Sequence, residues 1–277
     1  GIFERALGGH NADGSGAGAR LPRGRRSEDP PRVPALVGAG VQARRPVAAW
    51  SQHVIVLWYQ DRLGNRLAEY CFAKLLADRA EASLIALPIQ GFPNTGSTVR
   101  MGLPPLPSRI IRVGGHNPDL DRLAAQARSH HVLLHGWFMR YEFFRDHRAV
   151  IRHWLRTDVT APALRSNDLT IHVRSGDIWQ SEKAKDVHSD YHALPWSYYQ
   201  GILERRTWGR VYLVTEAPDD PMVQKLAREY SGEVVSRSPV EDFSFIRAST
   251  NVVLSASSFA WWAAWLSEAQ SIFYPVV

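Results

Sequence analysis

The sequence predicts an α/β protein with two parallel sheets, preceded by a disordered extension. Short apolar runs alternate with helical segments between residues 53 and 155, and the alternation restarts after residue 169. A loop over 157–167 separates the two series. Of the first 50 residues, 23 are Gly, Ala or Pro, without any apolar period, so they cannot form a packed core. We therefore expect an extension over 1–50, an N-terminal domain over 51–160 and a C-terminal domain over 161–277.

The composition excludes several classes of protein. Hydrophobic residues make up 45% and charged residues 22%, as in ordinary globular chains. No run of 18 apolar residues occurs, so no transmembrane segment is predicted. The single cysteine, Cys71, excludes an intrachain disulfide and a cysteine-based zinc site. The net charge of +6 arises mainly in the first 50 residues, which contain eight arginines and four acidic residues. The remainder holds 25 basic and 23 acidic residues, so we expect no nucleic-acid partner.

The first series opens with a strand, a turn and a helix. The apolar run 53–58 predicts a buried strand, residues 59–65 a turn, and the broad apolar face of 66–81 a helix. A second strand at 83–87 completes a βαβ unit. The Gly- and Pro-rich stretch 88–109 is a loop. Further strands are expected at 110–113 and 131–135, and helices at 117–129 and 141–155.

The second series alternates strictly, which predicts a parallel, doubly wound sheet. Its expected strands are 169–173, 211–215, 233–235, 251–255 and 271–274. Its expected helices are 196–206, 219–230, 240–249 and 258–269. The chain ends directly after the last strand, where a covering helix would follow, so we expect the C-terminal domain to be truncated at its end.

The first group of candidate functional residues is His172-Val173-Arg174-Ser175-Gly176-Asp177. Alternation puts His172 and Arg174 on one face at the carboxyl end of a strand, where open α/β sheets bind ligands. The planar guanidinium of Arg174 suits a pyrophosphate. Gly176 allows a close approach of backbone, and Asp177 can fix the arginine or a sugar hydroxyl. The alternative is a surface ion pair at a strand end.

The second group is Gly64-Asn65-Arg66, which opens the first helix directly after a strand. Backbone N–H groups and the positive end of the helix would face a ligand there. Alternatively, Asn65 serves only as the N-cap of the helix.

The third group runs from Leu254 to Leu266, where small hydroxyl residues leave a strand and enter a helix. Ser257 or Ser258 can cap that helix or donate a hydrogen bond to a phosphate. Phe259, Trp262 and Leu266 share one helical face, which favours core packing over ligand stacking.

The sequence gives no pattern typical of a metal site. Asp119 and Asp121 have the spacing of a carboxylate pair, but they begin a predicted surface helix, where acidic residues are favoured. The histidines show no metal-ligand spacing with acidic residues or cysteine. We therefore predict a site without a metal.

Taken together, these stretches resemble the GDP-fucose-dependent fucosyltransferases, most closely family 11, the α-1,2-fucosyltransferase-like glycosyltransferases. The matching stretches, in the family's order, are 62–70, 172–177, 241–243 and 255–262. The resemblance implies a GT-B architecture, in which two Rossmann-like domains face each other across a cleft. The C-terminal domain would hold the GDP-sugar, and the N-terminal domain would help to hold the acceptor.

The resemblance also implies roles for single residues. Arg174 would contact the diphosphate with His172 beside it, and Asp242 would contact guanine or ribose. Ser257 and Ser258 would contact phosphate, and Gly64 and Asn65 would face the donor from the first turn. The implied reaction is an inverting transfer of a sugar, fucose by this resemblance, from a GDP-sugar to a hydroxyl of a glycan or glycoconjugate. It needs no further cofactor. Arg174 and Asp177 are the candidate catalytic residues, and Asp177 and Glu69 are the candidate general bases.

Two alternatives stay open at this point. The donor could be another nucleotide sugar, or the chain could be a catalytically inactive relative that binds a nucleotide or a glycan. One cysteine and no readable signal or anchor favour the cytoplasm of a bacterium. A Golgi enzyme would need an anchor that this sequence does not show.

Overall fold

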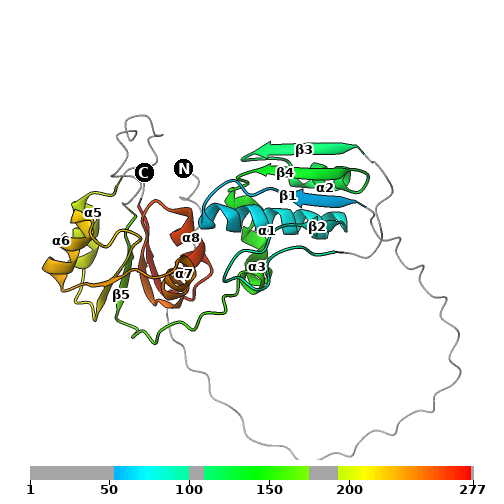
Figure 1. The fold of residues 1–277 in the computed structure, drawn as a ribbon. Coiled ribbons are helices and arrows are strands. Elements are labelled where there is room, and N and C mark those ends of the chain that lie inside the picture. Colours follow the sequence, from blue (N-terminus) through cyan, green and yellow to red (C-terminus); the bar gives the residue numbers. More distant parts are fainter. Residues whose placement is uncertain (1–52, 100–108, 175–192, 276–277) are drawn as a thin grey trace, which may run out of the picture. The chain divides into compact units, whose positions relative to one another are not determined.

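Two parallel β-sheets with flanking helices make up the described part of the chain (Figure 1). The structure, a computed structural model, describes residues 53–99, 109–174 and 193–275. The extension expected over residues 1–50 lies outside these ranges. The two sheets fall on either side of residue 160 in the sequence, and the expected α/β architecture is confirmed. Within the described ranges, no helix is long and apolar enough to cross a membrane.

The N-terminal sheet has the strand order β2-β1-β4-β3. Its strands are β1 (Val54–Leu57), β2 (Ser83–Ile85), β3 (Ile110–Gly115) and β4 (His131–Gly136). Helices α1 (Leu63–Ala80) and α2 (Leu120–Ala127) contact each other, and strand residues such as Ile55 and Leu134 are buried on one face. On the other face, Ile85 is 46% exposed and Ile110 is 65% exposed. This sheet therefore has one covered face and, among the residues described, one more open face.

The C-terminal sheet has the order β7-β6-β5-β8-β9. Its strands are β5 (Leu169–His172), β6 (Val211–Val214), β7 (Glu233–Val235), β8 (Asn251–Val253) and β9 (Ser271–Phe273). The connecting helices are α5 (Trp196–Leu203), α6 (Pro221–Tyr230), α7 (Pro239–Ala248) and α8 (Ser258–Trp265). Helices α5 and α6 cover one face, and α7 and α8 cover the other (Figure 1). Every residue of β5 and β6 is buried, as expected for strands covered on both sides.

The order of the C-terminal sheet reverses between β5 and β8. From β5 the chain proceeds outward to β6 and β7, and then crosses back to β8 and β9 on the other side. The helices that follow β5 and β8 consequently lie on opposite faces of the sheet. Ligands of doubly wound proteins bind at such a topological switch point.

The larger hydrophobic core is shared by the two sheets. Phe92 lies against Phe243 of α7 with ring centroids 5.3 Å apart, and Phe144 lies against Trp262 of α8 at 5.0 Å. Trp262 and Leu266 are buried, which confirms the packing role predicted for this face of the helix. A second, smaller core fills the space between the C-terminal sheet and helices α5 and α6.

Several helices begin at residues that satisfy their first N–H groups. Asp220 accepts hydrogen bonds from the N–H groups of Met222 and Val223 at the start of α6. Ser238 and Glu241 form a capping box at the start of α7. Asp119 accepts from the N–H of Arg122 at 3.0 Å, so this aspartate caps α2. The spacing of Asp119 and Asp121 is thereby explained by a helix start.

The predicted start of the first helix is wrong by three residues. Helix α1 begins at Leu63 with Arg62 as its N-cap, and the carbonyl of Arg62 accepts from the N–H groups of Asn65 and Arg66. Asn65 therefore lies inside the first turn, and the alternative that it is the N-cap is wrong. Its side chain is free for contacts outside the helix.

The helix predicted over 141–155 is also shorter than expected. Two 3-10 turns, η1 (Tyr141–Phe143) and η2 (Arg145–His147), precede α3 (Arg148–Trp154). Tyr141 lies edge-on to Trp261 of α8 at 6.1 Å, and Phe144 lies near Trp262. Both rings therefore contact α8 from these short turns.

Candidate active site at the carboxyl edges of the sheets

A buried hydrogen bond connects the two strands that flank the switch point. His172 is the last residue of β5, and Ser255 follows β8 by two residues. The Nδ1 atom of His172 lies 2.6 Å from Oγ of Ser255, and both residues are buried. The imidazole ring also lies against Phe259, with ring centroids 5.7 Å apart. These contacts of His172 with Ser255 and Phe259 hold the end of β5 against the segment that leads from β8 into α8.

The charge at this point comes from Arg174. Burial, together with the positive charge of Arg174, lowers the pKa of His172 to about 3. The imidazole is therefore neutral at physiological pH and does not repel the neighbouring guanidinium. Arg174 follows β5 by two residues, so it lies where an anionic ligand of this sheet would bind.

The hydroxyl groups at the start of α8 have different partners. Ser257 occupies the N-cap position of α8, but its side chain makes no capping hydrogen bond. The Oγ of Ser258 donates to Oδ1 of Asn65 at 2.8 Å, and Nδ2 of Asn65 donates to Oδ2 of Asp61 at 2.7 Å. This Asp61–Asn65–Ser258 chain brings together two predicted site residues that are 193 positions apart.

Gly64 allows the first turn of α1 to approach α8. A Cβ atom at Gly64 would lie 2.5 Å from the backbone nitrogen of Phe259 and 2.6 Å from Oγ of Ser258. Real Cβ atoms do not come so close to backbone atoms, so the contact requires glycine. Gly64 thus packs against Ser258 and Phe259 of α8. The predicted contact of Gly64 with the GDP-sugar stays a prediction.

Asp242 contributes a buried acceptor without a partner. It lies in the first turns of α7, which follows β7 and so begins at the same edge of the sheet. Its Oδ2 accepts from the N–H of Arg237 at 3.4 Å, whereas Oδ1 is buried and has no hydrogen-bond partner. Burial raises the pKa of Asp242 to about 6. A ligand with N–H or O–H donors, such as guanine or ribose, could satisfy this oxygen.

Glu69 is a second buried carboxyl group with an unpartnered oxygen. Its Oε2 accepts from the N–H of Gln60 at 3.1 Å, whereas Oε1 has no partner. Burial raises the pKa of Glu69 to about 7, and the nearby charge of Asp61 acts in the same direction. A carboxyl group with a pKa near neutrality is suited to general-base chemistry. The other candidate base, Asp177, lies outside the described residues, as does Gly176.

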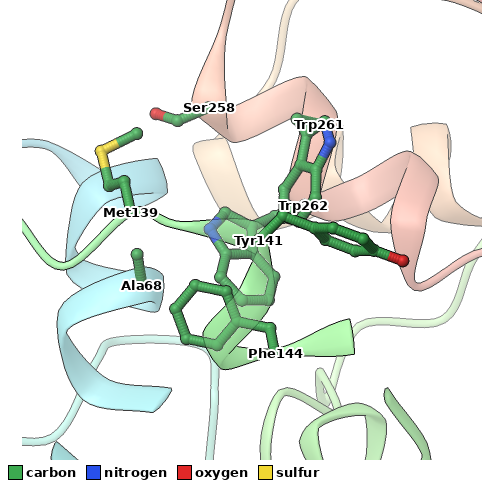
Figure 2. Close-up of a pocket in the computed structure, with 7 residues that line it drawn as sticks. All are labelled: Ala68, Met139, Tyr141, Phe144, Ser258, Trp261 and Trp262. Atoms are coloured by element: carbon green, nitrogen blue, oxygen red, sulfur yellow. The ribbon is translucent and has the colours of Figure 1, made fainter. Parts of the chain in front are cut away.

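The aromatic residues at the start of α8 close the space beside Ser258. Figure 2 shows a cavity lined by side chains of α1, of the segment after β4 and of α8. Its lining residues are Ala68, Met139, Tyr141, Phe144, Ser258, Trp261 and Trp262. Its volume is about 10 Å³, which is room for about one water molecule. The cavity therefore cannot hold a nucleotide, and the tryptophans act as packing residues.

Three partners of the site were not predicted from the sequence. Ser255 was part of a motif, but its bond to His172 depends on β5 and β8 being neighbours. Asp61 accepts a hydrogen bond from the side chain of Asn65. Its position in the predicted turn does not indicate this contact. Arg62 contacts Glu216 at 3.4 Å, and both side chains are exposed. Glu216 follows β6, so this ion pair also joins the carboxyl edges of the two sheets.

Two Rossmann-like parallel sheets, with a switch point that carries His172 and Arg174, define a fold of the GT-B type. Residues 134–274 match the profile of glycosyl transferase family 11. The matched range contains His172, Arg174, Asp242, and Ser257 and Ser258 at the start of α8. The chain belongs to glycosyl transferase family 11.

Similar solved structures include two fucosyltransferases. One is an arginine-to-lysine mutant of Arabidopsis thaliana FUT1 in complex with GDP, with 12% sequence identity and a TM-score of 0.49. The match covers 83% of this chain and 72% of that chain. The other is POFUT1 in complex with GDP-fucose, with 10% identity and a TM-score of 0.44, covering 82% of this chain and 98% of that chain. No curated protein sequence matches the chain.

Proposed function

We propose that this protein transfers fucose from GDP-fucose to a hydroxyl group of a glycan, with inversion at the anomeric carbon. Membership of glycosyl transferase family 11 supports the class of reaction. The observation that carries the proposal is the buried His172–Ser255 bond of 2.6 Å at the switch point, next to Arg174 and the start of α8. An arginine and a helix N-terminus at one switch point suit a diphosphate.

In the proposed reaction, the acceptor oxygen attacks C1 of the sugar while the bond from C1 to the β-phosphate oxygen breaks. Negative charge grows on the β-phosphate of the departing GDP. Arg174 offers a fixed positive charge to that oxygen, which is more effective than a charge that must first be reoriented. Because the hydroxyl hydrogen of Ser258 is donated to Asn65, we assign the phosphate contact first to Ser257.

The remaining roles follow from the two buried carboxyl groups. We assign the free oxygen of Asp242 to a donor hydrogen of the guanine or ribose of GDP. The proton of the acceptor hydroxyl must pass to a base, for which Glu69 and Asp177 are the candidates. Glu69 is supported by its pKa of about 7, at which a useful fraction is ionised at neutral pH.

The test is the release of GDP from a panel of GDP-sugars and UDP-sugars without acceptor, with EDTA present. The variant Arg174→Ala is compared with the wild type and with Arg228→Ala, an exposed arginine of α6. We expect slow hydrolysis of GDP-fucose by the wild type and by Arg228→Ala. Loss of one charge-assisted contact in the transition state costs roughly 2–4 kcal/mol, so Arg174→Ala should be about 30 to 1000 times slower.

Each other outcome corrects the proposal in a defined way. Hydrolysis of another donor that depends on Arg174 would keep the mechanism and change the substrate. GDP binding without any turnover, even with acceptors, would identify an inactive relative. Normal hydrolysis by Arg174→Ala would refute the role of the arginine.

A further inference from the structure

A row of exposed rings lies at the carboxyl edge of the N-terminal sheet. Trp58 follows β1 and is 65% exposed, and Trp137 follows β4 and is 37% exposed. His116 follows β3, and its ring stacks on that of Trp137 at 4.9 Å and 12°. We call Trp58, Trp137 and His116 the edge row.

The strand register puts the edge row on one face of the sheet. Leu57 is paired with Leu134, so the next residue, Trp58, lies opposite His135, and its N–H donates to the carbonyl of Leu134. Burial alternates along β4, and His135 and Trp137 both fall on the more exposed side. Gly115 is paired with Gly136, which brings His116 opposite Trp137. The register therefore puts the three residues on the more open face, where the rings of His116 and Trp137 stack.

The chemistry of the edge row suits a saccharide. A pyranose ring has an apolar face of C–H groups and a rim of hydroxyl groups. An indole can stack on the apolar face, while the ring nitrogens of His116 and His135 can exchange hydrogen bonds with hydroxyl groups. Trp58 and Trp137 thus offer apolar ring surface at the edge where parallel α/β sheets bind ligands.

Both segments that carry the tryptophans lead to the candidate donor site. The turn that starts at Trp58 continues to Asp61 and Asn65, which reach Ser258 of α8. The segment after Trp137 continues to Tyr141, whose ring contacts Trp261 of α8. A ligand on the edge row would thus lie on the same elements that contact the start of α8.

We propose that the edge row is the acceptor subsite, on which a pyranose ring of the acceptor glycan stacks against Trp58 or Trp137. This inference rests on the proposed transfer to a glycan and assigns residues to its acceptor. It commits to a saccharide as the occupant. A second copy of the chain or another protein is the competing occupant that the experiment must separate.

The test measures saccharide binding and GDP binding separately by isothermal titration calorimetry on the full chain. The saccharide probes are lactose, cellobiose, maltose and chitobiose. We compare the wild type with Trp58→Ala, Trp137→Ala, Trp58→Phe and the control Trp196→Ala, which removes a tryptophan of α5. We expect at least one probe to bind the wild type and Trp196→Ala equally. Each edge-row alanine variant should bind it about two to ten times more weakly, Trp58→Phe should fall between, and GDP affinity should be unchanged.

Three results would overturn the acceptor subsite. One is equal saccharide affinity of the wild type and the edge-row variants, and another is no saccharide binding by a folded wild type. The third is a change of oligomeric state in the edge-row variants, seen by light scattering, with saccharide binding unaffected, which would make the row a protein interface. Failure of GDP to bind would count against the proposed function alone, because saccharide binding is read independently.

Discussion

At the scale of single residues, the candidate site is marked by carboxyl groups that the fold leaves incompletely bonded. Glu69 and Asp242 each bury one oxygen without a hydrogen-bond partner. Burial raises the pKa of Glu69 to about 7 and that of Asp242 to about 6. A buried acceptor without a donor lowers stability, and such groups concentrate at functional sites.

The substitution Glu69→Gln tests the first of these groups. The folded protein keeps a proton on Glu69 that the unfolded chain loses between about pH 4.5 and 7, so this residue lowers stability progressively as the pH rises through that window. Glutamine keeps an acceptor for the N–H of Gln60 and does not titrate. We therefore expect urea unfolding to show that Glu69→Gln gains more stability over the wild type at pH 8 than at pH 5.

The transfer rate of Glu69→Gln tests whether Glu69 is the general base or only a buried carboxyl group without a catalytic role. If Glu69 is the base, transfer should fall by about 100-fold or more, while GDP affinity stays the same. Transfer at the normal rate with an unchanged pH profile would assign the base elsewhere, with Asp177 next to be tested. An equal stability difference at both pH values would show that Glu69 does not titrate in the window expected.

At the scale of elements, the contact between α1 and α8 depends on one missing side chain. Alanine is normally better than glycine inside a helix by about 1 kcal/mol. At Gly64, however, the added Cβ would lie 2.5 Å from the backbone of Phe259, which cannot easily move. The steric overlap should outweigh the gain in helix propensity.

We expect Gly64→Ala to lower the free energy of unfolding by about 1–2 kcal/mol, within the usual range for overpacking. The control is Gly201→Ala in α5, where an added Cβ would meet nothing within 4 Å. The control should be neutral or slightly stabilising, by up to about 1 kcal/mol. Equal effects of the two substitutions on thermal unfolding would contradict a close contact at Gly64.

The elements themselves could be predicted because their signals are local. Apolar runs, helical periodicity and residues such as Ser238 and Pro239 set the strands and most helix starts. The predicted start of α1 was wrong because its N-cap, Arg62, makes no side-chain capping hydrogen bond. Arginine is also not a residue type that typically marks the start of a helix. The bonds His172–Ser255 and Asn65–Ser258 could not be predicted, since they depend on strand order and on how two distant helices meet.

At the scale of the whole molecule, arginines join the part of the chain before residue 160 to the helices of the C-terminal sheet. Nε of Arg148 donates to the carbonyl of Trp265 at 2.7 Å, and Nη2 donates to the carbonyl of Ser267. In the opposite direction, Arg247 of α7 donates to the carbonyl of Leu155 after α3, at 2.8 Å. A cation near the last carbonyls of a helix also interacts favourably with its dipole.

We expect Arg148→Met to destabilise the protein by about 1–2 kcal/mol, because two carbonyls lose a charged donor that water can only partly replace. The matched control is Arg145→Met, which removes an exposed ion pair with Asp146 and should change stability by less than about 0.5 kcal/mol. Denaturation followed by tryptophan fluorescence and by circular dichroism should coincide, since the main core spans both sheets. Two separate transitions would show that the sheets unfold independently.

The contact of Gly64 with the backbone of Phe259 also limits how the sequence can diverge. A side chain at position 64 is tolerated only where the start of α8 has moved, so the two positions should change together among homologous chains. Chimaeras that join the first half of one homologue to the second half of another should fold well only when both parents share the residue at position 64. This contact therefore couples the evolution of the two halves at position 64, although each half contributes its own sheet.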